Sequence, residues 1–314
     1  SYGGMIGVTS SSGPGIALKT EAMGLAVNAE LPLLIINWQR GGPSTGLPTK
    51  TEQSDLYQAV YGRNADTPIP VLAAASSADC FTMAIEAVRI ALRHMTPVIL
   101  LADGYLSNAA EPWQIPELAS FDPIEHNAPP ALDDGDQVQE LAFSRDAQSY
   151  GRPWITPGMP GLMYRVGGLE KDITTGHISY DPQNHERMTA LRAAKVDSVA
   201  DRIPDQTIEL GPDAGKLVIV GWGSTYGPIY QAANKTGVSF VHLRHLNPLP
   251  RNLGDLLGRF EKILVPEMNN GQLVTLLRDK LGVDPVSLTK ISGQPFLINE
   301  LVARVEAELG STAK

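Results

Sequence analysis

Residues 31–51 read LPLLIINWQRGGPSTGLPTKT, and this stretch decides the fold. Its first eight residues form a short, nearly continuous apolar run, the pattern of a strand buried on both faces. Gln39, Arg40 and a loop rich in glycine, proline, serine and threonine follow at once. A buried strand that ends in such a loop is typical of α/β proteins, which bind ligands at the carboxyl edge of a sheet. The stretch therefore predicts an α/β fold with a ligand site directly after this strand.

Arg40 is the most informative residue of the loop. Its guanidinium offers a fixed fork of donors suited to a carboxylate or a phosphate. The hydroxyls of Ser44, Thr45 and Thr49 can complete the hydrogen bonding, and the glycines let backbone amides approach a ligand closely. The loop is thus a candidate site for a small oxyanion. The alternative is a surface loop whose Arg40 pairs with a structural carboxylate, and spacing alone does not decide between the two.

The composition excludes several classes of function. The chain has 314 residues, 43% of them hydrophobic, so one large or two ordinary domains are expected. The net charge is −9 without a basic run, which argues against nucleic acid as the main partner. The single cysteine, Cys80, excludes an internal disulfide and a cysteine-ligated metal or iron–sulfur site. We expect a cytoplasmic protein without a membrane-spanning helix, because no run of about 20 apolar residues occurs.

Strands and helices alternate along residues 1–110, which predicts a parallel-sheet domain. Strands are expected at residues 5–9, 31–38, 71–75 and 98–103, and helices at 16–29 and 77–95. In the helix expected at 77–95, apolar residues recur at helical spacing and Asp79 lies in the first turn. The first strand would begin within a few residues of Ser1, so we expect the natural chain to extend further upstream.

The rest of the chain divides into two parts. Residues 111–214 are proline-rich and weakly periodic, which predicts an irregular connector with one helix at residues 182–203, capped by Asp181. Residues 215–314 return to βα alternation and predict a second, smaller α/β domain. Its strands are expected at residues 217–222, 239–243, 262–265 and 286–291, and its helices after residue 227 and at 271–281 and 297–309.

Two glycine-containing loops and two histidines are weaker candidates. The loops at residues 12–15 and 221–224 each precede a helix, where anions bind readily, but neither has dinucleotide or P-loop spacing. A structural turn is therefore the favoured interpretation of both. His242 and His245 are three apart, and on a strand residues at that spacing point to opposite faces and cannot share a metal ion.

The acidic residues behind the Arg40 loop are also open to two interpretations. Glu52 and Asp55 could act as acid or base, but helix capping and solvation explain them equally well. No Gly-x-Ser-x-Gly elbow of a Ser-His-Asp hydrolase is present. The residues by themselves therefore indicate a two-domain α/β protein with one oxyanion-binding loop, and they do not name a reaction.

Residues 37–56, NWQRGGPSTGLPTKTEQSDL, resemble the alpha subunit of 2-oxoacid:ferredoxin oxidoreductases, in particular the 2-oxoglutarate type. The resemblance extends over essentially the whole chain, with agreement at residues 9–15, 97–111, 180–188, 221–228, 243–250 and 265–273. It implies a thiamine-diphosphate pyrimidine-binding-like domain, followed by a mainly structural domain similar to the C-terminal domain of transketolase-like enzymes.

The resemblance also implies a reaction. Such enzymes decarboxylate a 2-oxoacid on thiamine diphosphate, pass electrons to ferredoxin and transfer the acyl group to coenzyme A. The beta subunit would hold the diphosphate, Mg²⁺ and an iron–sulfur cluster, in an alpha2beta2 assembly. Pyruvate or a branched-chain 2-oxoacid is an alternative substrate to 2-oxoglutarate, and a non-catalytic scaffold subunit is the alternative from another class.

Matching positions supply residue roles. Arg40 would bind the substrate carboxylate as the catalytic residue, Thr49 would hydrogen-bond it, and Ser44 and Thr45 would line the same pocket. The loop with Ser12 and Gly13 would lie near the pyrimidine ring instead of a phosphate. A Tyr-Pro-Ile-Thr-Pro motif, the activating glutamate and the related gamma domain are expected outside residues 1–314, and we therefore expect residues 1–314 to be inactive on their own.

Overall fold

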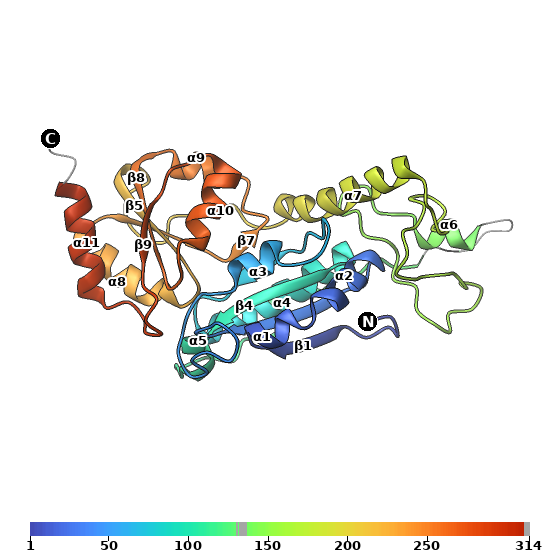
Figure 1. Ribbon diagram of the computed structural model, residues 1–314, viewed down its shortest axis with the longest axis horizontal. Coiled ribbons are helices and arrows are strands. Elements are labelled where there is room, and N and C mark those ends of the chain that lie inside the picture. Colours follow the sequence, from blue (N-terminus) through green and yellow to red (C-terminus); the bar gives the residue numbers. More distant parts are fainter. Residues whose placement is uncertain (130, 132–136, 311–314) are drawn as a thin grey trace.

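A computed structural model describes residues 1–129, 131 and 137–310. Four strands from the first part of the chain and one from near residue 245 form a five-stranded sheet in the order β1-β2-β4-β3-β7. Figure 1 labels β1, β4 and β7 of this sheet. Its strands are β1 (Gly7–Ser11), β2 (Leu33–Gln39), β4 (Pro97–Asp103), β3 (Val71–Ala73) and β7 (His245–Asn247). The first four are parallel, as predicted, whereas β7 pairs antiparallel with β3.

Helices cover both faces of this sheet. On one face lie α1 (Gly13–Ala17), α2 (Thr20–Asn28) and α3 (Leu56–Tyr61), and α4 (Ser77–His94) packs on the other. Consecutive strand residues point to opposite faces, so Ile35 packs with the α1–α3 side while its neighbour Leu34 packs with the α4 side. Both are almost fully buried, which explains the continuous apolar run in the sequence.

The predicted helices are confirmed with some changes of boundary. α4 matches its prediction to one residue; the hydroxyl of Ser76 caps it by accepting the amide N–H of Asp79, at 3.2 Å. The single helix predicted at residues 16–29 is instead two, because α1 ends at Ala17 and α2 begins at Thr20. Leu18 between them is 89% exposed, and the break lets Ile16 and Met23 both reach the core.

A four-stranded, all-parallel sheet forms the second domain, in the order β6-β5-β8-β9. Its strands are β5 (Gly215–Trp222), β6 (Ser239–Leu243), β8 (Phe260–Glu267) and β9 (Val286–Thr289). The helices α8 (Tyr226–Thr236), preceded by η3 (Gly223–Thr225), and α11 (Ile298–Gly310) cover one face. The helices α9 (Leu253–Leu257) and α10 (Gln272–Leu281) cover the other face, and their core residues join the cluster that contains α1–α3. The two domains therefore share one continuous apolar core.

The intervening segment is irregular, as predicted. It contains η1 (Leu118–Ser120), α6 (Val138–Ala142), α7 (Pro182–Asp197) and η2 (Ser198–Asp201), and α5 (Gly104–Asn108) precedes it. The carboxylate of Asp181 accepts the amide hydrogen of Asn184 at 2.7 Å, so the predicted cap of α7 is confirmed. The helix predicted at residues 182–203 is shorter in the structure. The α-helix α7 ends at Asp197, and the short 3₁₀ turn η2 continues it to Asp201. The division at residues 110 and 214 remains a proposal, and β7 crosses it by joining the first sheet.

The expectation that alternation along a strand separates His242 and His245 is corrected by the structure. His242 lies on β6 and His245 on β7, which belong to different sheets, because the chain crosses between the domains at Arg244. Their separation therefore follows from the topology and not from alternation along one strand. Among the residues that the structure describes, no helix combines the length and apolar character needed to cross a bilayer.

Candidate active site

The Arg40 loop leaves the carboxyl end of β2 and returns to α3. Its base is closed by two backbone hydrogen bonds, from Gly41 N to Lys50 O at 3.0 Å and from Leu47 N to Gly41 O at 2.8 Å. Gly46 has a φ of 42°, and a Cβ there would lie 2.2 Å from the oxygen of Gly41. Only glycine allows this close approach. The loop is therefore a fixed structure at its base, while residues 42–50 are exposed.

A cleft of about 620 Å³ opens where the loops after β1 and β2 meet α1 and α3. It lies at the carboxyl edge of the parallel sheet, the place where α/β proteins bind ligands. The lining residues come from four segments, and they are Gly13, Pro14, Ala17, Leu18, Arg40, Gly42, Pro43, Ser44, Glu52, Ser54, Asp55 and Gln58. The cleft thus lies directly after β2, where the sequence predicts a ligand site.

Arg40 lies in this cleft without a partner for its side chain. No carboxylate within residues 1–129, 131 and 137–310 forms an ion pair with its guanidinium. Its Nε is buried and has no hydrogen-bond acceptor. Arg40 as a whole is half-buried, but a buried donor such as this Nε is costly unless a ligand satisfies it. The arrangement favours the oxyanion-binding interpretation of Arg40 over that of a structural ion pair.

Glu52 and Asp55 share the cleft with Arg40. Burial raises the pKa of both carboxyl groups above their usual values, although Asp55 accepts hydrogen bonds from Asn37 Nδ2 at 3.0 Å and from Ser54 Oγ at 3.2 Å. Asp55 occupies the N-cap position of α3, yet its side chain makes no capping bond. Helix capping therefore does not explain Asp55. A carboxyl group with a raised pKa that lines a cleft is a candidate functional group.

The other predicted site residues are divided between the cleft and its surroundings. Ser44 and Gly13 line it; Ser44 has a φ of 55°, a backbone conformation unusual for serine. Thr45 and Thr49 lie on the exposed part of the loop and are not among the lining residues. Ser12 precedes α1 and its side chain makes no capping bond there. The roles of Thr45, Thr49 and Ser12 stay predictions.

The loop at residues 221–224 binds a carboxylate of the chain itself. The amide of Ser224, at the start of η3, donates to Asp103 Oδ2 at 3.1 Å. Asp103 is the last residue of β4 and is 1% exposed. The helix terminus that resembled a phosphate site thus holds an internal anion, in keeping with the structural interpretation.

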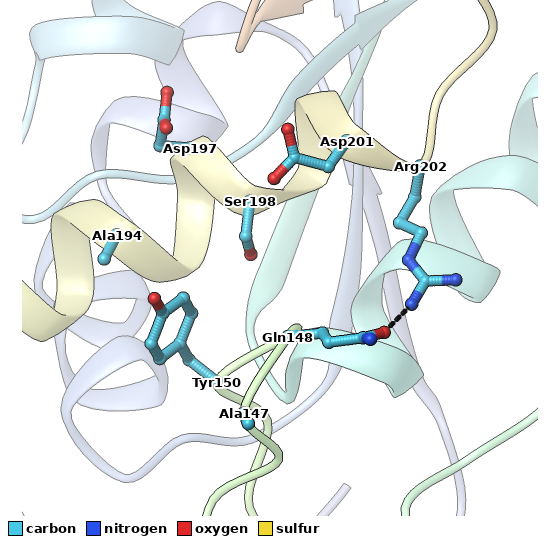
Figure 2. A pocket seen from close by; sticks show the side chains of 8 residues that line it. All are labelled: Ala147, Gln148, Tyr150, Ala194, Asp197, Ser198, Asp201 and Arg202. Atoms are coloured by element: carbon cyan, nitrogen blue, oxygen red, sulfur yellow. Dashed lines mark hydrogen bonds between the residues drawn. The ribbon is translucent and has the colours of Figure 1, made fainter.

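A second cavity, of about 500 Å³, lies between residues 147–150 and the end of α7 (Figure 2). Asp197 and Asp201 are its acidic lining residues, and both pair with Arg251, at 2.8 and 2.9 Å. The guanidinium of Arg202 donates to the side chain of Gln148. Because these charges are already paired, this cavity offers a ligand less than the Arg40 cleft does.

Comparisons with known proteins agree with this geometry. Residues 1–153 match the family model described as pyruvate flavodoxin/ferredoxin oxidoreductase, thiamine diphosphate-binding. The 2-oxoglutarate oxidoreductase subunit KorA of Mycobacterium tuberculosis is 50% identical over 98% of this chain, which spans about half (47%) of that relative. The 2-oxoglutarate synthase subunit KorA of Archaeoglobus fulgidus is 32% identical, over 98% of this chain and 81% of that protein.

The chain belongs to the family of 2-oxoacid:ferredoxin oxidoreductase alpha subunits.

A solved member of this family has the same fold. The 2-oxoglutarate:ferredoxin oxidoreductase from Magnetococcus marinus, with 2-oxoglutarate, coenzyme A and succinyl-CoA bound, superimposes with a TM-score of 0.91. It is 33% identical, and the match covers 98% of this chain and 54% of that one. The resemblance expected from residues 37–56 and the predicted α/β, thiamine-diphosphate-binding fold are therefore confirmed. The likeness of the second domain to transketolase stays a prediction.

The cleft fits the ring portion of the cofactor that this alpha-subunit family uses. Pro14, Ala17 and Pro43 give it an apolar wall, and Gln58 contributes a buried Oε1 that accepts no hydrogen bond from the described residues. An apolar wall beside an unused acceptor suits an aromatic ring that carries an amino group. The sequence alone did not single out Gln58, because nothing local to α3 indicates that its amide faces a cleft.

Proposed function

We propose that this chain is the catalytic part of the alpha subunit of a 2-oxoglutarate:ferredoxin oxidoreductase. The complete enzyme would convert 2-oxoglutarate and coenzyme A to succinyl-CoA and CO₂, with two electrons passed to ferredoxin. Since the chain spans about half of its M. tuberculosis relative, this activity is proposed for the assembled protein. The unpaired guanidinium of Arg40 in the cleft is the observation that carries the proposal, because it offers the substrate carboxylate a charged partner.

The residues of the cleft divide the work. Arg40 would bind the C1 carboxylate of the 2-oxoacid, and the hydroxyls of Ser44, Thr45 and Thr49 would complete its hydrogen bonds from the loop. Gln58 Oε1 would accept from the pyrimidine amino group, with Ser12 and Gly13 beside the ring. The carbon nucleophile for the 2-oxo group would come from thiamine diphosphate when that cofactor is bound. The carboxyl groups of Asp55 and Glu52, whose pKa values burial raises, would lie beside the substrate.

The partners follow from the family. We assign the diphosphate, Mg²⁺ and iron–sulfur cluster to a beta subunit, in an alpha2beta2 assembly in the cytoplasm. The chain's single cysteine supports this assignment, because one thiolate is too few to ligate an iron–sulfur cluster. Ferredoxin would receive its electrons from the beta subunit.

Dye reduction by the complete enzyme tests this function. With coenzyme A and a viologen dye, 2-oxoglutarate should give a kcat/KM at least tenfold above that with pyruvate or a branched-chain 2-oxoacid. A higher kcat/KM with pyruvate or a branched-chain 2-oxoacid would support the same reaction but with that 2-oxoacid as the preferred substrate. Absence of dye reduction with every 2-oxoacid, by an enzyme that carries its cofactor and cluster, would refute the proposal.

A further inference from the structure

Residues 51–55, which follow the Arg40 loop, direct some of their side chains into the cleft and the others away from it. Glu52, Ser54 and Asp55 line the cleft. Thr51 and Gln53, which alternate with them, face away from it: Thr51 Oγ1 donates to Asp103 Oδ1 at 3.1 Å, and Gln53 reaches the second domain. The short segment of residues 51–55 therefore carries the cleft's acidic groups on one side and a contact with the second domain on the other.

Gln53 is the centre of that contact and is fully buried. Its side-chain Nε2 donates to Trp222 O at 2.7 Å, and its Oε1 accepts from Met268 N at 2.9 Å. Its backbone N–H donates to Met268 O at 2.9 Å, and its backbone oxygen accepts from Asn269 Nδ2 at 2.8 Å. Trp222 ends β5 and Met268 follows β8, so four hydrogen bonds join this residue to the carboxyl ends of two strands of the second sheet.

The second domain is shaped to receive this amide. Gly223 has a φ of 60°, and a Cβ there would lie 2.8 Å from Gln53 Nε2. Asn269, which holds the backbone of Gln53, is held in turn by Glu267 Oε1 at 3.0 Å. Glu267 is fully buried and also accepts the amide hydrogens of Leu273 and Val274 at the start of α10. The contact is thus supported on its far side by the second sheet and a helix.

We propose that Gln53 is a positioning residue, through which the second domain fixes Glu52, Ser54 and Asp55 in the substrate cleft. Ser54 extends the effect to the arginine, because its hydroxyl lies within hydrogen-bond distance of two acceptors, the backbone oxygen of Arg40 at 3.0 Å and Asp55 Oδ1 at 3.2 Å. The second domain, expected to be mainly structural, then has a direct part in the geometry of the site. This role rests on the proposed function for its kinetic consequence, but its structural consequence is independent of it.

Two variants of the complete enzyme separate positioning from general stability. Gln53→Met keeps the side chain's shape and removes both of its hydrogen bonds. Asn252→Leu is the matched control: this amide also bonds one backbone N–H and one backbone oxygen, both of Gln206, at 2.8 and 2.9 Å, and it does not line the cleft. A third variant, Gly223→Ala, displaces the Gln53 amide without removing it. It is measured alongside Gln53→Met and keeps the test possible if Gln53→Met does not assemble.

Steady-state kinetics should show a selective effect. We expect Gln53→Met and Gly223→Ala to raise KM for the 2-oxoacid at least fivefold and to leave KM for coenzyme A within twofold. Asn252→Leu should leave both constants within twofold, even where it lowers the unfolding midpoint as much. Equal changes in both constants, or no change in KM for the 2-oxoacid, would overturn the proposal.

Hydrogen–deuterium exchange gives an outcome that does not depend on catalysis. In Gln53→Met, amides of residues 50–56 should exchange at least tenfold faster than in the unaltered enzyme, and in Asn252→Leu they should not. If the unaltered enzyme reduces no dye, the proposed function fails, and exchange still decides whether Gln53 fixes this segment. Unchanged exchange in Gln53→Met would refute the positioning role even in an active enzyme.

Discussion

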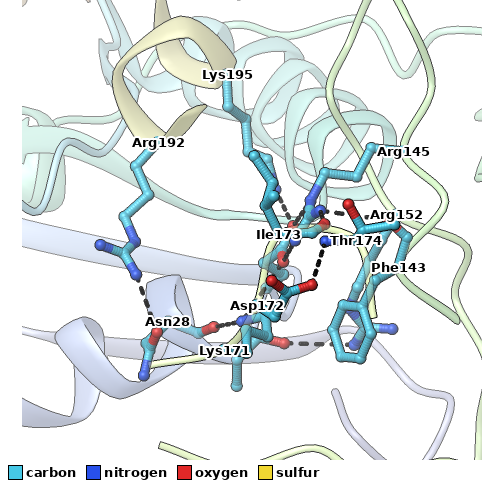
Figure 3. A network of polar contacts seen from close by, with 12 residues as sticks. Asn28, Phe143, Arg145, Arg152, Lys171, Asp172, Ile173, Thr174, Arg192 and Lys195 are labelled. Carbon is cyan, nitrogen blue, oxygen red and sulfur yellow. Dashed lines mark hydrogen bonds and ion pairs between the residues drawn. The ribbon is translucent and has the colours of Figure 1, made fainter. Parts of the chain in front are cut away.

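Arg145 binds both oxygens of the Glu30 carboxylate, with Nη2 2.7 Å from Oε1 and Nε 3.1 Å from Oε2. Figure 3 shows Arg145, Lys171 and Lys195 within this polar network. Both side chains are less than 10% exposed. Two further buried cations approach the same carboxylate, Lys195 at 2.6 Å and Lys171 at 3.5 Å. Burial alone would raise the pKa of Glu30, but the charges of Lys195, Lys171 and Arg145 hold it well below its usual value. One carboxylate therefore balances three cations where the connector meets the first domain.

Glu30→Gln should destabilise the protein strongly. It leaves three buried cations without their counter-charge, and removal of one partner of a buried ion pair costs about 3–5 kcal/mol in free energy of unfolding. Chemical denaturation at pH 7 measures the loss. The control is Glu300→Gln, the same substitution at the half-exposed pair with Lys290, where the loss should stay below about 1 kcal/mol. Equal losses in the two variants would contradict a special role for Glu30.

His94 should make the protein less stable in acid. Its ring is 1% exposed and Nδ1 lies 2.9 Å from the oxygen of Ser149; burial lowers its pKa to about 4, from 6.5 in the unfolded chain. Between these two values the unfolded state binds the proton and the folded state does not. Its contribution to stability is thus complete above pH 6.5 and declines as the pH falls towards 4, by about 3 kcal/mol.

The measurement is the free energy of unfolding at intervals from pH 7 to pH 4.5. His94→Leu should lie below the parent protein at pH 7, because the oxygen of Ser149 loses its partner, but its stability should decline less steeply with acid. His177→Leu, at an exposed ring, serves as the control and should keep the parent slope. If all three proteins show one slope, His94 is not the group that titrates.

Much of the fold could be predicted from local pattern. The strand predicted at residues 239–243 is β6 without change, because a short apolar run with both faces covered carries its own boundaries. The addition of β7 to the first sheet could not be predicted. Leu72 pairs with His245, more than 170 residues away, and nothing near either residue encodes that pairing. The break between α1 and α2 was missed because an apolar helical face was taken to be continuous through Leu18.

The candidate site was predictable only in part, for a similar reason. Arg40 could be found because it directly follows a buried strand, which fixes its place at the edge of the sheet. Asp55 and Gln58 could not be assigned, because their burial and their facing into the cleft arise from the packing of α3 against α1. Nothing in the sequence indicated Gln53 either, since its three partner residues, Trp222, Met268 and Asn269, lie in a domain that begins more than 150 residues later.

Arg40→Ala should lower kcat/KM for the 2-oxoacid by about ten- to a hundredfold, the loss of about 1.5–3 kcal/mol expected for a charge-assisted contact. Arg40→Lys keeps the charge but not the fork of donors, so its loss should be intermediate. Arg278→Ala, at an exposed ion pair with Asp284, should change kcat/KM less than twofold. Turnover by Arg40→Ala close to that of the parent enzyme would favour a scaffold subunit over a catalytic one.

Gly13→Ala should act through Asp55. A Cβ on residue 13 would lie 2.7 Å from Asp55 Oδ2 and 3.0 Å from Oδ1, closer than nonbonded atoms approach. The carboxylate must then move away from Asn37, and we expect a loss of about 1–3 kcal/mol in free energy of unfolding, together with a higher KM for the 2-oxoacid. In the Asp55→Ala background the same substitution meets no carboxylate, so most of that loss should disappear.

The double-mutant cycle of Gly13→Ala and Asp55→Ala measures this contact as a coupling free energy of about 1 kcal/mol or more. Gly227→Ala provides the matched control, because a Cβ on that glycine of α8 would have no atom within 4 Å. Alanine is the better helix former, so that variant should equal or exceed the parent in stability by up to about 1 kcal/mol. Additive effects of Gly13→Ala and Asp55→Ala would show that the glycine serves the turn into α1 and not the carboxylate in the cleft.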